Sequence, residues 1–296
     1  MGDKMNGLKL IYNYKDIPEY RLSFNELANE IFGISFESWY NVGGWNDRYI
    51  CYSYIDKNKV VANVSISKMD IVWEGKNKKA LQIGTVMTHP DYRNRGLSAS
   101  LINIILEEHQ NKYDFIYLFA NKTVLDFYPK FGFKQLLQSQ FSMHVNIHKS
   151  RSEGIRKLDI LNANDFDTIV RLTSERIPIS KNLGVKNDQG LLLFYCLSAF
   201  ENNLYYFEDE DIIVIYEDKS DKLYLYDVIS KGEICVSDIV SKISTVEIRK
   251  VFFCFTPDFD GMDIICEPLQ NEDTLFIKST LMDITKEFAF PITSHA

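Results

Sequence analysis

The pattern of apolar residues in the first half of the chain changes its period once, and this change limits the possible folds. Three strand-like stretches, separated by polar and turn-prone sequences, cover residues 50–55, 60–72 and 80–87. After Pro90, apolar residues recur at helical spacing from Leu97 to Ile105. Adjacent strands followed by an amphipathic helix favour an α/β fold of the α+β kind, with one mixed sheet and helices on its faces.

The flanking segments complete the expected order of elements. Residues 7–15 alternate as a strand does, and Asp16 can cap the helix that follows. That helix has Pro18 in its first turn and is expected to end at Gly33. The aromatic-rich segment 36–49 is typical of a short helix or a loop. Downstream we expect a strand at 115–119, a short helix at 123–130 and a final strand at 133–145.

The charge distribution suggests two domains, and 296 residues are about the length of two ordinary domains. Residues 1–150 hold 18 Lys and Arg against 15 Asp and Glu, whereas residues 151–296 hold 15 against 26. The polar segment 148–154 lies between the two halves. The second half repeats the order of elements in reduced form, so we predict a catalytic domain at 1–150 and an acidic, degenerate copy of it at 151–296.

The composition disfavours several classes of function. Five cysteines include no CxxC pair and five histidines show no HExxH spacing, so no metal site is expected. A net charge of −8 without a basic stripe disfavours nucleic-acid binding. No apolar run approaches the roughly 20 residues of a membrane span, and the first ten residues lack the apolar core of a secretion signal. We therefore expect a cytoplasmic protein that binds neither membranes nor nucleic acid.

The segment 83–98, IGTVMTHPDYRNRGLS, carries the clearest indication of chemistry. It leads from a strand through a short basic loop into a helix. The free N–H groups of a first helical turn attract phosphate, and Gly96 allows a close approach of the backbone. Arg93 and Arg95 add positive charge. The segment therefore predicts a diphosphate site, although this pattern alone also occurs at helix starts that bind nothing.

Together with the downstream segment ANKTVLDFYPKFGF, this loop resembles the GNAT superfamily of acyl-CoA-dependent N-acyltransferases. Arg93, Gly96 and Ser98 match the superfamily motif [Q/R]xxGx[G/A], with a serine where Gly or Ala is usual. That serine could add a hydroxyl contact to phosphate. The superfamily segment N-x(5)-FYxxxGF is matched by Asn121, Phe127, Tyr128, Gly132 and Phe133. The resemblance implies the acyl-CoA N-acyltransferase fold for the first half and a second, GNAT-like domain after it.

The resemblance also implies an N-acetyltransferase with acetyl-CoA as its cosubstrate. The backbone of Val86, Met87 and Thr88 would bind the pantetheine arm and the thioester carbonyl. The diphosphate would be held by the loop and first helical turn, namely Arg93, Asn94, Arg95, Gly96, Leu97 and Ser98. The acetyl group would pass directly to a primary amine in a ternary complex, with catalysis from proximity and backbone oxyanion donors.

Two further residues have implied roles and alternatives that stay open. Tyr128 occupies the general-acid position of the superfamily, and a phenol with a pKa near 10 suits protonation of a leaving thiolate. The same tyrosine could simply pack among its aromatic neighbours. Asn121 could orient the cofactor, or it could cap the helix that follows.

No general base stands out from the sequence. The strand ALQIGTV contains no carboxylate, and Asp47 and Asp70 are both more typical of solvated surface charges. The chain end FAFPITSHA is unusually apolar and offers His295 or the Ala296 carboxylate as the proton acceptor. Some GNAT enzymes, among them those of the enhanced-intracellular-survival type, resemble this in using a C-terminal carboxylate. Alternatively, the tail completes the sheet of the second domain.

The acceptor is expected to be a small-molecule or peptide amine. The aromatic residues Trp39, Tyr40 and Trp45 lie where the superfamily builds its acceptor wall, although each could also be core. The acidic run 208–211 favours a cationic acceptor, but such runs are equally common as solvated turns. The second-half loop 227–235 lacks an Arg-rich turn and carries a glutamate, so we expect one CoA site per chain.

Two other functions remain open from the sequence. A GNAT-like protein without catalysis could sense CoA or dock a partner, which the missing strand carboxylate favours and Tyr128 disfavours. Paired GNAT-like domains also transfer aminoacyl groups, but such a function needs a tRNA-binding surface, which the acidic second half does not supply.

Overall fold

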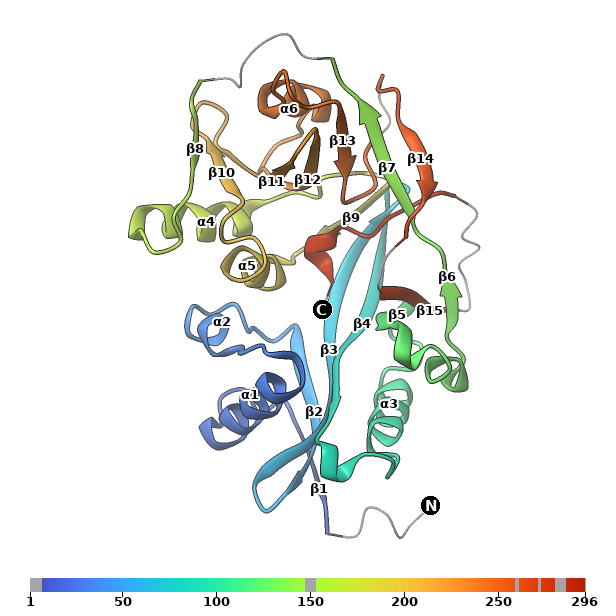
Figure 1. Ribbon diagram of the computed structural model, residues 1–296. Coiled ribbons are helices and arrows are strands. Elements are labelled where there is room, and N and C mark those ends of the chain that lie inside the picture. The colour runs from blue at the N-terminus through green and yellow to red at the C-terminus, as the bar shows by residue number, and fades with distance from the viewer. Residues whose placement is uncertain (1–6, 147–152, 259–260, 271–272, 280–285, 296) are drawn as a thin grey trace.

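The computed structural model describes residues 7–146, 153–258, 261–270, 273–279 and 286–295. Two mixed β-sheets lie one above the other, with helices on their faces (Figure 1). The predicted α/β class with a mixed sheet is therefore confirmed, and most strands of the second sheet come from the second half of the chain.

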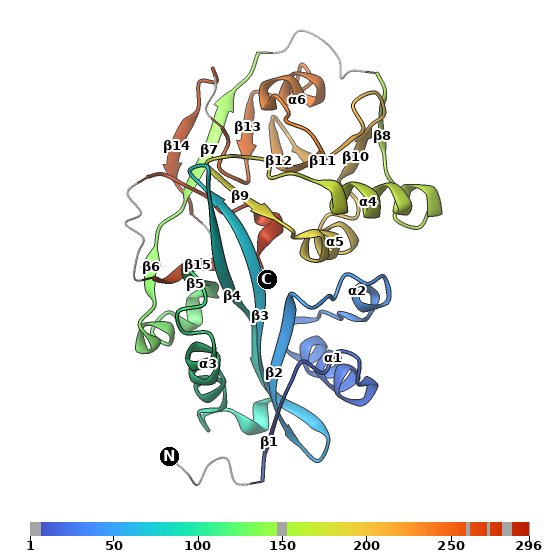
Figure 2. The same cartoon turned by 180° about the vertical axis from the view of Figure 1, so that it is seen from behind.

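The first sheet positions the candidate site. Its strands, in spatial order, are β1 (Lys9–Tyr12), β2 (Tyr49–Asp56), β3 (Lys59–Trp73), β4 (Lys76–Thr88), β5 (Phe115–Asn121), β15 (Asp273–Ser279) and β6 (Lys134–Leu136). A further strand, β9 (Leu183–Lys186), pairs with the far end of β3. The helices α1 (Pro18–Phe32) and α2 (Glu37–Asn41) lie on one face and α3 (Leu97–Glu108) lies on the other (Figure 2).

The second sheet has seven strands in the order β14 (Ile265–Pro268), β7 (Ser139–His144), β13 (Lys250–Phe253), β12 (Lys222–Ile229), β11 (Ile212–Lys219), β10 (Leu204–Phe207) and β8 (Ile155–Lys157). Its helices are α4 (Ala163–Glu175), α5 (Gln189–Leu197) and α6 (Val236–Ile243). Short 3₁₀ turns are η2 (Pro90–Tyr92), η3 (Lys122–Val124), η4 (Tyr128–Phe131) and η5 (Ile292–Ser294). Helix α5 and η5 lie between the two sheets (Figure 1).

The sheets do not separate at residue 150, because strands are exchanged across it. The expected final strand 133–145 is two strands, of which β6 stays in the first sheet and β7 joins the second. In return, β15 from the end of the chain inserts between β5 and β6, with Asp273 opposite Asn121 and Ser279 opposite Phe115. Backbone hydrogen bonds between segments distant in the sequence therefore connect the two halves of the chain. The hydrophobic periodicity of a single segment does not indicate which distant strand it will pair with.

The helix starts follow local chemistry, with one correction. Ile17, and not Asp16, is the residue before α1, and it makes no side-chain cap; Pro18 opens the helix as expected. Asp16 instead pairs with Lys15 at 3.2 Å. Gly33 ends α1 in the left-handed conformation at φ 70°, which glycine adopts without steric cost.

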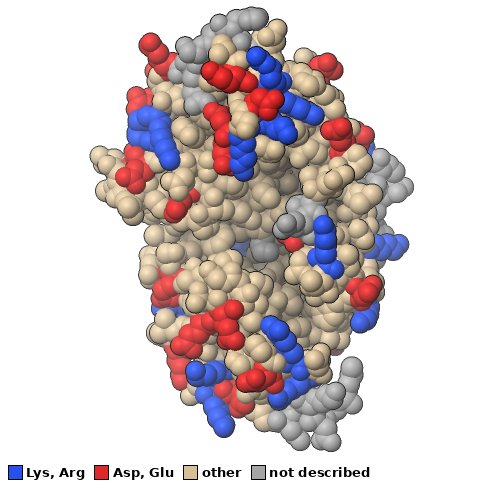
Figure 3. All heavy atoms as spheres, in the orientation of Figure 1, with Lys and Arg blue, Asp and Glu red and all other residues tan. Residues whose placement is uncertain are grey.

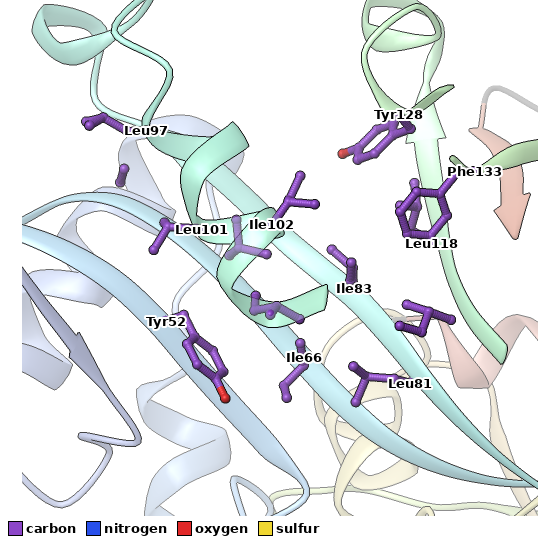
Figure 4. Close-up of a cluster of buried hydrophobic side chains, with 14 of the residues drawn as sticks. Tyr52, Ile66, Leu81, Ile83, Leu97, Leu101, Ile102, Leu118, Tyr128 and Phe133 are labelled. Atoms are coloured by element: carbon purple, nitrogen blue, oxygen red, sulfur yellow. The ribbon is translucent and has the colours of Figure 1, made fainter. Parts of the chain in front are cut away.

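The core of the first sheet confirms the helical spacing read from residues 97–105. Leu97, Leu101 and Ile105 are buried against the sheet, with Ile104 only partly covered. Figure 4 shows side chains of α3 meeting those of β3, β4 and β5, including Ile66, Ile83 and Leu118. One apolar face of α3 therefore fixes the helix, and with it the loop before the helix, against the sheet.

Because β15 inserts between β5 and β6, we predict that residues 1–150 cannot fold as an independent unit. A fragment of these residues lacks β15, which leaves the facing edges of β5 and β6 unpaired and removes Phe276 from the core. We expect no cooperative thermal unfolding of the fragment by circular dichroism, while the full chain unfolds cooperatively. A cooperative transition of the fragment close to the melting temperature of the full chain would contradict this.

Candidate active site

A β-bulge in β4 creates the candidate site. Asn63 of β3 pairs with Met87 and Ser65 pairs with Gly84, so β4 has one extra residue over this interval. Thr85 lies in the bulge with φ 47°, a conformation that is uncommon for a β-branched residue. The bulge bends β4 away from the strand on its other side.

Beyond the bulge, β4 and β5 separate. Their parallel pairing runs from Ala80 opposite Phe115 to Ile83 opposite Leu118 and stops there. A groove of about 860 Å³ opens between the diverging strands, lined by β4 residues 83–88, the start of α3, the end of β5 and Tyr128. Backbone N–H and C=O groups on this edge of β4 are therefore available to an extended ligand, as at other open strand edges.

Buried polar side chains hold the bulge in place. The Asn63 amide donates to the carbonyl oxygen of Thr85 at 2.9 Å, and Asn63 itself is fully buried. Its Oδ1 accepts a hydrogen bond from the Ser53 hydroxyl at 2.8 Å, which in turn lies 2.6 Å from the hydroxyl of Tyr14. The Tyr49 and Thr85 hydroxyls, on the same face of the sheet, are 2.7 Å apart. These hydrogen bonds compensate the cost of burying polar groups and fix one position for the bulge.

The loop before α3 presents the free N–H groups of the helix start to the groove. Gly96, at φ 80°, is the residue before the helix, and Asn94 is also left-handed at φ 61°. Arg95 donates to the carbonyl oxygen of Asp91 at 2.6 Å and lies over the ring of Tyr92. Arg93 donates to the carbonyl oxygen of Thr88 at 3.3 Å. Two exposed guanidinium groups therefore flank the positive end of the helix dipole, which suits a diphosphate.

The groove brings together every residue predicted to bind the cofactor. Its lining includes Val86, Met87, Thr88, Arg93, Asn94, Arg95, Gly96, Leu97, Ser98 and Asn121. The side chains of Met87 and Leu97 are buried in the core, so these two can contribute only their backbone. The hydroxyl of Ser98 lies 2.8 Å from that of Thr88 and so links β4 to α3. Its contact with phosphate stays a prediction.

A second cavity of about 420 Å³ adjoins the groove. The two share Phe32, Thr85, Phe119 and Asp273 as lining residues. Its walls come from both halves of the chain, namely Ile34, Phe36, Trp39 and Tyr49 from the first and Leu191, Phe194, Tyr195, Ile292 and His295 from the second. A ligand in the groove and a ligand in this cavity can therefore meet beside the bulge.

Sequence comparison assigns the half that carries the groove. Residues 21–136 match the family model of the acetyltransferase (GNAT) domain. The match identifies a GNAT acetyltransferase domain at these residues. A search of curated protein sequences gives no significant match to the chain.

Comparison of structures extends the fold to most of the chain. A conserved Enterococcus faecalis V583 protein, described as a probable N-acyltransferase, aligns with a TM-score of 0.60 and 14% identity over 92% of this chain and 71% of that one. A GCN5-related N-acetyltransferase from Kribbella flavida gives 0.55 and 18% over 92% and 72%. Eis1 from Mycobacterium abscessus gives 0.56 and 11% over 90% and 72%. These likenesses concern the fold.

Tyr128, the predicted proton donor, lies at the groove. It lines the groove from η4 and is 5% exposed, with its ring against Phe133 and Phe276. Figure 4 shows the ring beside Phe133 with its hydroxyl pointing away from it. Burial raises the pKa of Tyr128 to about 12, so the phenol keeps its proton at neutral pH. The ring of Tyr128 packs among its aromatic neighbours, and the residue also lines the groove. The packing alternative is thus compatible with a role as proton donor, which stays a prediction.

Asn121 caps the turn that follows β5. Its Oδ1 accepts a hydrogen bond from the backbone N–H of Thr123 at 3.0 Å. The capping alternative is therefore confirmed for this oxygen. The side chain also lines the groove, so an orienting contact with the cofactor stays a prediction.

The three aromatic residues expected at the acceptor wall divide into three different positions. Trp39 lines the second cavity, and its indole N–H donates to the carbonyl oxygen of Gly190 at 2.6 Å. Trp45 is buried in the core beneath the cavity. Tyr40 instead packs under the guanidinium of Arg21 at 3.7 Å, and it is absent from the lining of both cavities.

The chain end reaches the second cavity. Its described residues 286–295 contain no strand, so among them the tail does not complete the second sheet. The His295 ring stacks on Phe119 with centroids 3.6 Å apart, and Tyr195 donates to the His295 carbonyl at 2.7 Å. Burial lowers the pKa of His295 to about 3. The imidazole is thus a weak proton acceptor, contrary to the pKa near 6.5 on which its predicted role depended. Ala296 lies outside the described residues.

The other acidic candidates are engaged elsewhere. Asp47 pairs with Lys15 at 3.2 Å, and Asp70 pairs with Arg48 at 3.0 Å. Neither lines the groove or the second cavity.

The acidic run 208–211 does not face the acceptor. Asp211 accepts hydrogen bonds from Arg171 at 2.6 Å and from Lys231 at 2.7 Å, which hold the pKa of its carboxyl well below the usual range. Glu208 pairs with Arg156 at 2.9 Å. These charges are compensated within the second half, and none of the run lines either cavity. The argument from this run to a cationic acceptor is therefore wrong.

The second half repeats the bulge, but the tail covers the strand ends beside it. One extra residue in β12 shifts its register against β11, and the parallel pairing of β12 with β13 ends at Leu225. There the tail lies across the strand ends: Ile292 donates to the carbonyl oxygen of Cys254 at 3.0 Å, and Thr293 donates to Asp227. Glu233, in the loop that corresponds to the basic one, pairs with Lys181. The tail thus covers the strand ends, whereas a cavity of about 520 Å³ lies beside the corresponding loop and the start of α6, lined by Ser230, Glu233 and Val236 among others.

Sequence analysis missed two residues that shape the site. Asn63 interrupts an apolar strand, VVANVSIS, and a polar side chain at such a position is a signal for a buried hydrogen-bond network. Asp273 lies at the junction of the groove and the second cavity. In the sequence it is far from the GNAT-like motifs and has no recognisable motif around it.

Neither a metal-binding cluster nor a membrane-spanning helix occurs among the residues that the structure describes. Among these residues, no cluster of three or more His, Cys, Asp or Glu could hold a metal ion. Within the same ranges, no helix has the length and apolar character needed to cross a bilayer.

The role of Asn63 predicts a coupled loss of stability and binding. Asn63→Leu keeps the branching of the side chain but leaves the Thr85 carbonyl and its hydroxyl partners unpaired, so it should cost at least about 2 kcal/mol of unfolding free energy. Because the bulge is then free to relax, the Kd for acetyl-CoA should rise at least about tenfold, which is 1.4 kcal/mol. Urea unfolding and calorimetry measure the two effects.

A matched control separates the bulge from general destabilisation. Ile169→Ala in the buried core of the second half should also cost about 2–5 kcal/mol, yet leave the acetyl-CoA Kd unchanged. Equal changes of Kd in both variants would show that Asn63 acts only through stability.

Proposed function

We propose that the protein is an acyl-CoA-dependent N-acyltransferase that transfers an acetyl group from acetyl-CoA to the primary amine of a small molecule or peptide. The observation that carries the proposal is the open edge of β4 beside the start of α3, with an adjoining cavity at the bulge. The diphosphate would lie against residues 94–98, and the pantetheine arm would extend along residues 86–88. The GNAT match over residues 21–136 supports this use of the groove.

The geometry supports direct attack of the amine on the thioester. The amine nitrogen forms a bond to the carbonyl carbon, and the bond from carbon to sulfur breaks. Negative charge that develops on the carbonyl oxygen would be stabilised by backbone N–H groups at the bulge. The leaving thiolate would take the proton of Tyr128, and the new amide nitrogen would lose one proton to a base. Both substrates meet beside Thr85, which supplies the proximity that this mechanism requires.

The function is tested by binding and turnover together. Titration with acetyl-CoA in a calorimeter should give one site per chain, because the corresponding loop of the second half lacks the two arginines and carries Glu233. A thiol-release assay with a panel of amines should then show turnover. Binding without thiol release from any amine would favour a CoA-sensing protein, and a stoichiometry of two would contradict the single site.

The assignment of Tyr128 as proton donor predicts a selective loss of kcat. Tyr128→Phe keeps the ring packing and should lower kcat at least about 100-fold, since a positioned acid contributes about 10²–10⁴. The KM for acetyl-CoA and the melting temperature should stay nearly unchanged. Tyr113→Phe, at a half-buried tyrosine outside the groove, is the control. A loss of less than about tenfold would exclude the phenol as the donor.

For the base, we propose the Ala296 carboxylate at the chain end. The stack of His295 on Phe119 brings the end of the described chain to the second cavity, and the lowered pKa of His295 disfavours its imidazole. Deleting residues 294–296 would also remove the buried Ser294, so it would confuse catalysis with stability.

An added pair of glycines tests this proposal without removing packed residues. The extension moves the carboxylate beyond Ala296 and should lower kcat at least about 100-fold at an unchanged melting temperature. His295→Phe, which can keep the stack on Phe119, should retain most of the activity. Normal turnover of the extended chain would contradict the role of the terminal carboxylate.

A further inference from the structure

We propose that the amine acceptor has a compact apolar or aromatic body and a single ammonium group, which binds next to Asp273. The body would occupy the second cavity, and the ammonium would lie where this cavity joins the groove. The inference deepens the proposed function, since it assigns a substrate class to the same site. It rests on the lining of the cavity and on the position of one carboxylate.

The lining of the second cavity is apolar and aromatic on most sides. Phe36, Trp39 and Tyr49 form the wall from the first half, and Leu191 and Phe194 of α5 form the facing wall. Phe36 stacks on Phe194 with centroids 5.5 Å apart, so the walls meet through ring contacts. A volume of about 420 Å³ holds one or two fused rings with a short side chain.

The rim of the cavity exposes apolar side chains. Phe32 is 44% exposed and Ile34 is 39% exposed, although large apolar side chains are usually covered in a monomer. In the view of Figure 3, the middle of the molecular surface is hollowed and mostly uncharged. The side chains of Lys, Arg, Asp and Glu gather above and below this region. An apolar ligand would cover surface that is otherwise left to water.

Asp273 supplies a negative charge at the junction. It begins β15 opposite Asn121 and lines both the groove and the cavity. Within the described ranges its carboxylate has no ion-pair or hydrogen-bond partner. Burial and then the charge of Asp273 raise the pKa of Tyr195, which lines the same cavity. An ammonium group placed here would be paired and would lie beside Thr85, where the thioester is proposed to lie.

The charge count of the lining selects against polycations. Apart from the chain-end carboxylate proposed as the base, Asp273 is the only carboxylate among the described residues that line the cavity. A polyamine or aminoglycoside would bring further ammonium groups against rings, where each charge loses hydration without gaining a partner. The acidic run 208–211, which could have compensated such charges, is paired with Arg156, Arg171 and Lys231.

The direct test is binding of amines to the full chain saturated with CoA, in which no acyl transfer occurs. Calorimetry with 2-phenylethylamine and tryptamine should give a Kd at least about tenfold lower than spermidine or kanamycin. The neutral analogue 2-phenylethanol should bind more weakly than 2-phenylethylamine. Tighter binding of spermidine or kanamycin than of either aromatic amine would overturn the substrate class.

Variants of the carboxylate test its role. Asp273→Asn should weaken 2-phenylethylamine at least about tenfold and leave 2-phenylethanol unchanged, since only the amine gains from the charge. Asp47→Asn, at an exposed carboxylate outside both cavities, should change neither. An equal loss for amine and alcohol, or none for the amine, would overturn the assignment of Asp273.

The outcomes also separate this inference from the proposed function. Binding of aromatic amines together with CoA but no thiol release from acetyl-CoA would contradict the acyltransferase and leave the cavity assignment intact. Thiol release with spermidine that is faster than with every aromatic amine would support the acyltransferase and overturn the substrate class. A large preference for octanoyl-CoA over acetyl-CoA, with no binding of aromatic amines, would assign the cavity to the acyl chain and overturn the inference.

Discussion

The hydrogen bond from the buried Asn63 amide to the Thr85 carbonyl holds the bulge on which the groove depends. Without a bulge, β4 would continue its parallel pairing with β5 past Ile83, and no backbone edge would be open to a ligand. The network that includes Ser53 and Tyr14 also shows why a sheet core contains so many hydroxyl groups. Here the buried polar side chains fix the shape of the backbone, because a network with all its hydrogen bonds made specifies one position of the bulge.

The exchange of strands makes the site a product of both halves. Strand β15 brings Asp273 to the groove, and α5 and the tail form one wall of the second cavity. A buried ion pair between Arg176 and Asp227 lies close to this wall, since Asp227 also accepts a hydrogen bond from Thr293 of the tail. The second half thus acts as a scaffold: its own bulge is covered by the tail, and the tail is thereby positioned against the GNAT domain.

Local features of the site could be predicted from the sequence, because they depend on a few consecutive residues. Gly96 at the helix start, the two arginines before it and Tyr128 all lie at the groove as the motifs indicate. Features that depend on pairing between distant segments could not be predicted. The split of 133–145 into β6 and β7 and the insertion of β15 depend on partners more than a hundred residues away. The acidic run misled for the same reason, since its cationic partners are scattered along the second half.

The central claim is that acyl-CoA binds along the open edge of β4 and at the start of α3, and only there. Hydrogen exchange measured by mass spectrometry, with and without acetyl-CoA, tests this claim most directly. Slower exchange is predicted for amides in residues 84–88 and 94–98, with no change in residues 230–237 of the corresponding second-half loop. Protection of residues 230–237, or saturation by acetyl-CoA without protection of residues 84–88 and 94–98, would contradict it.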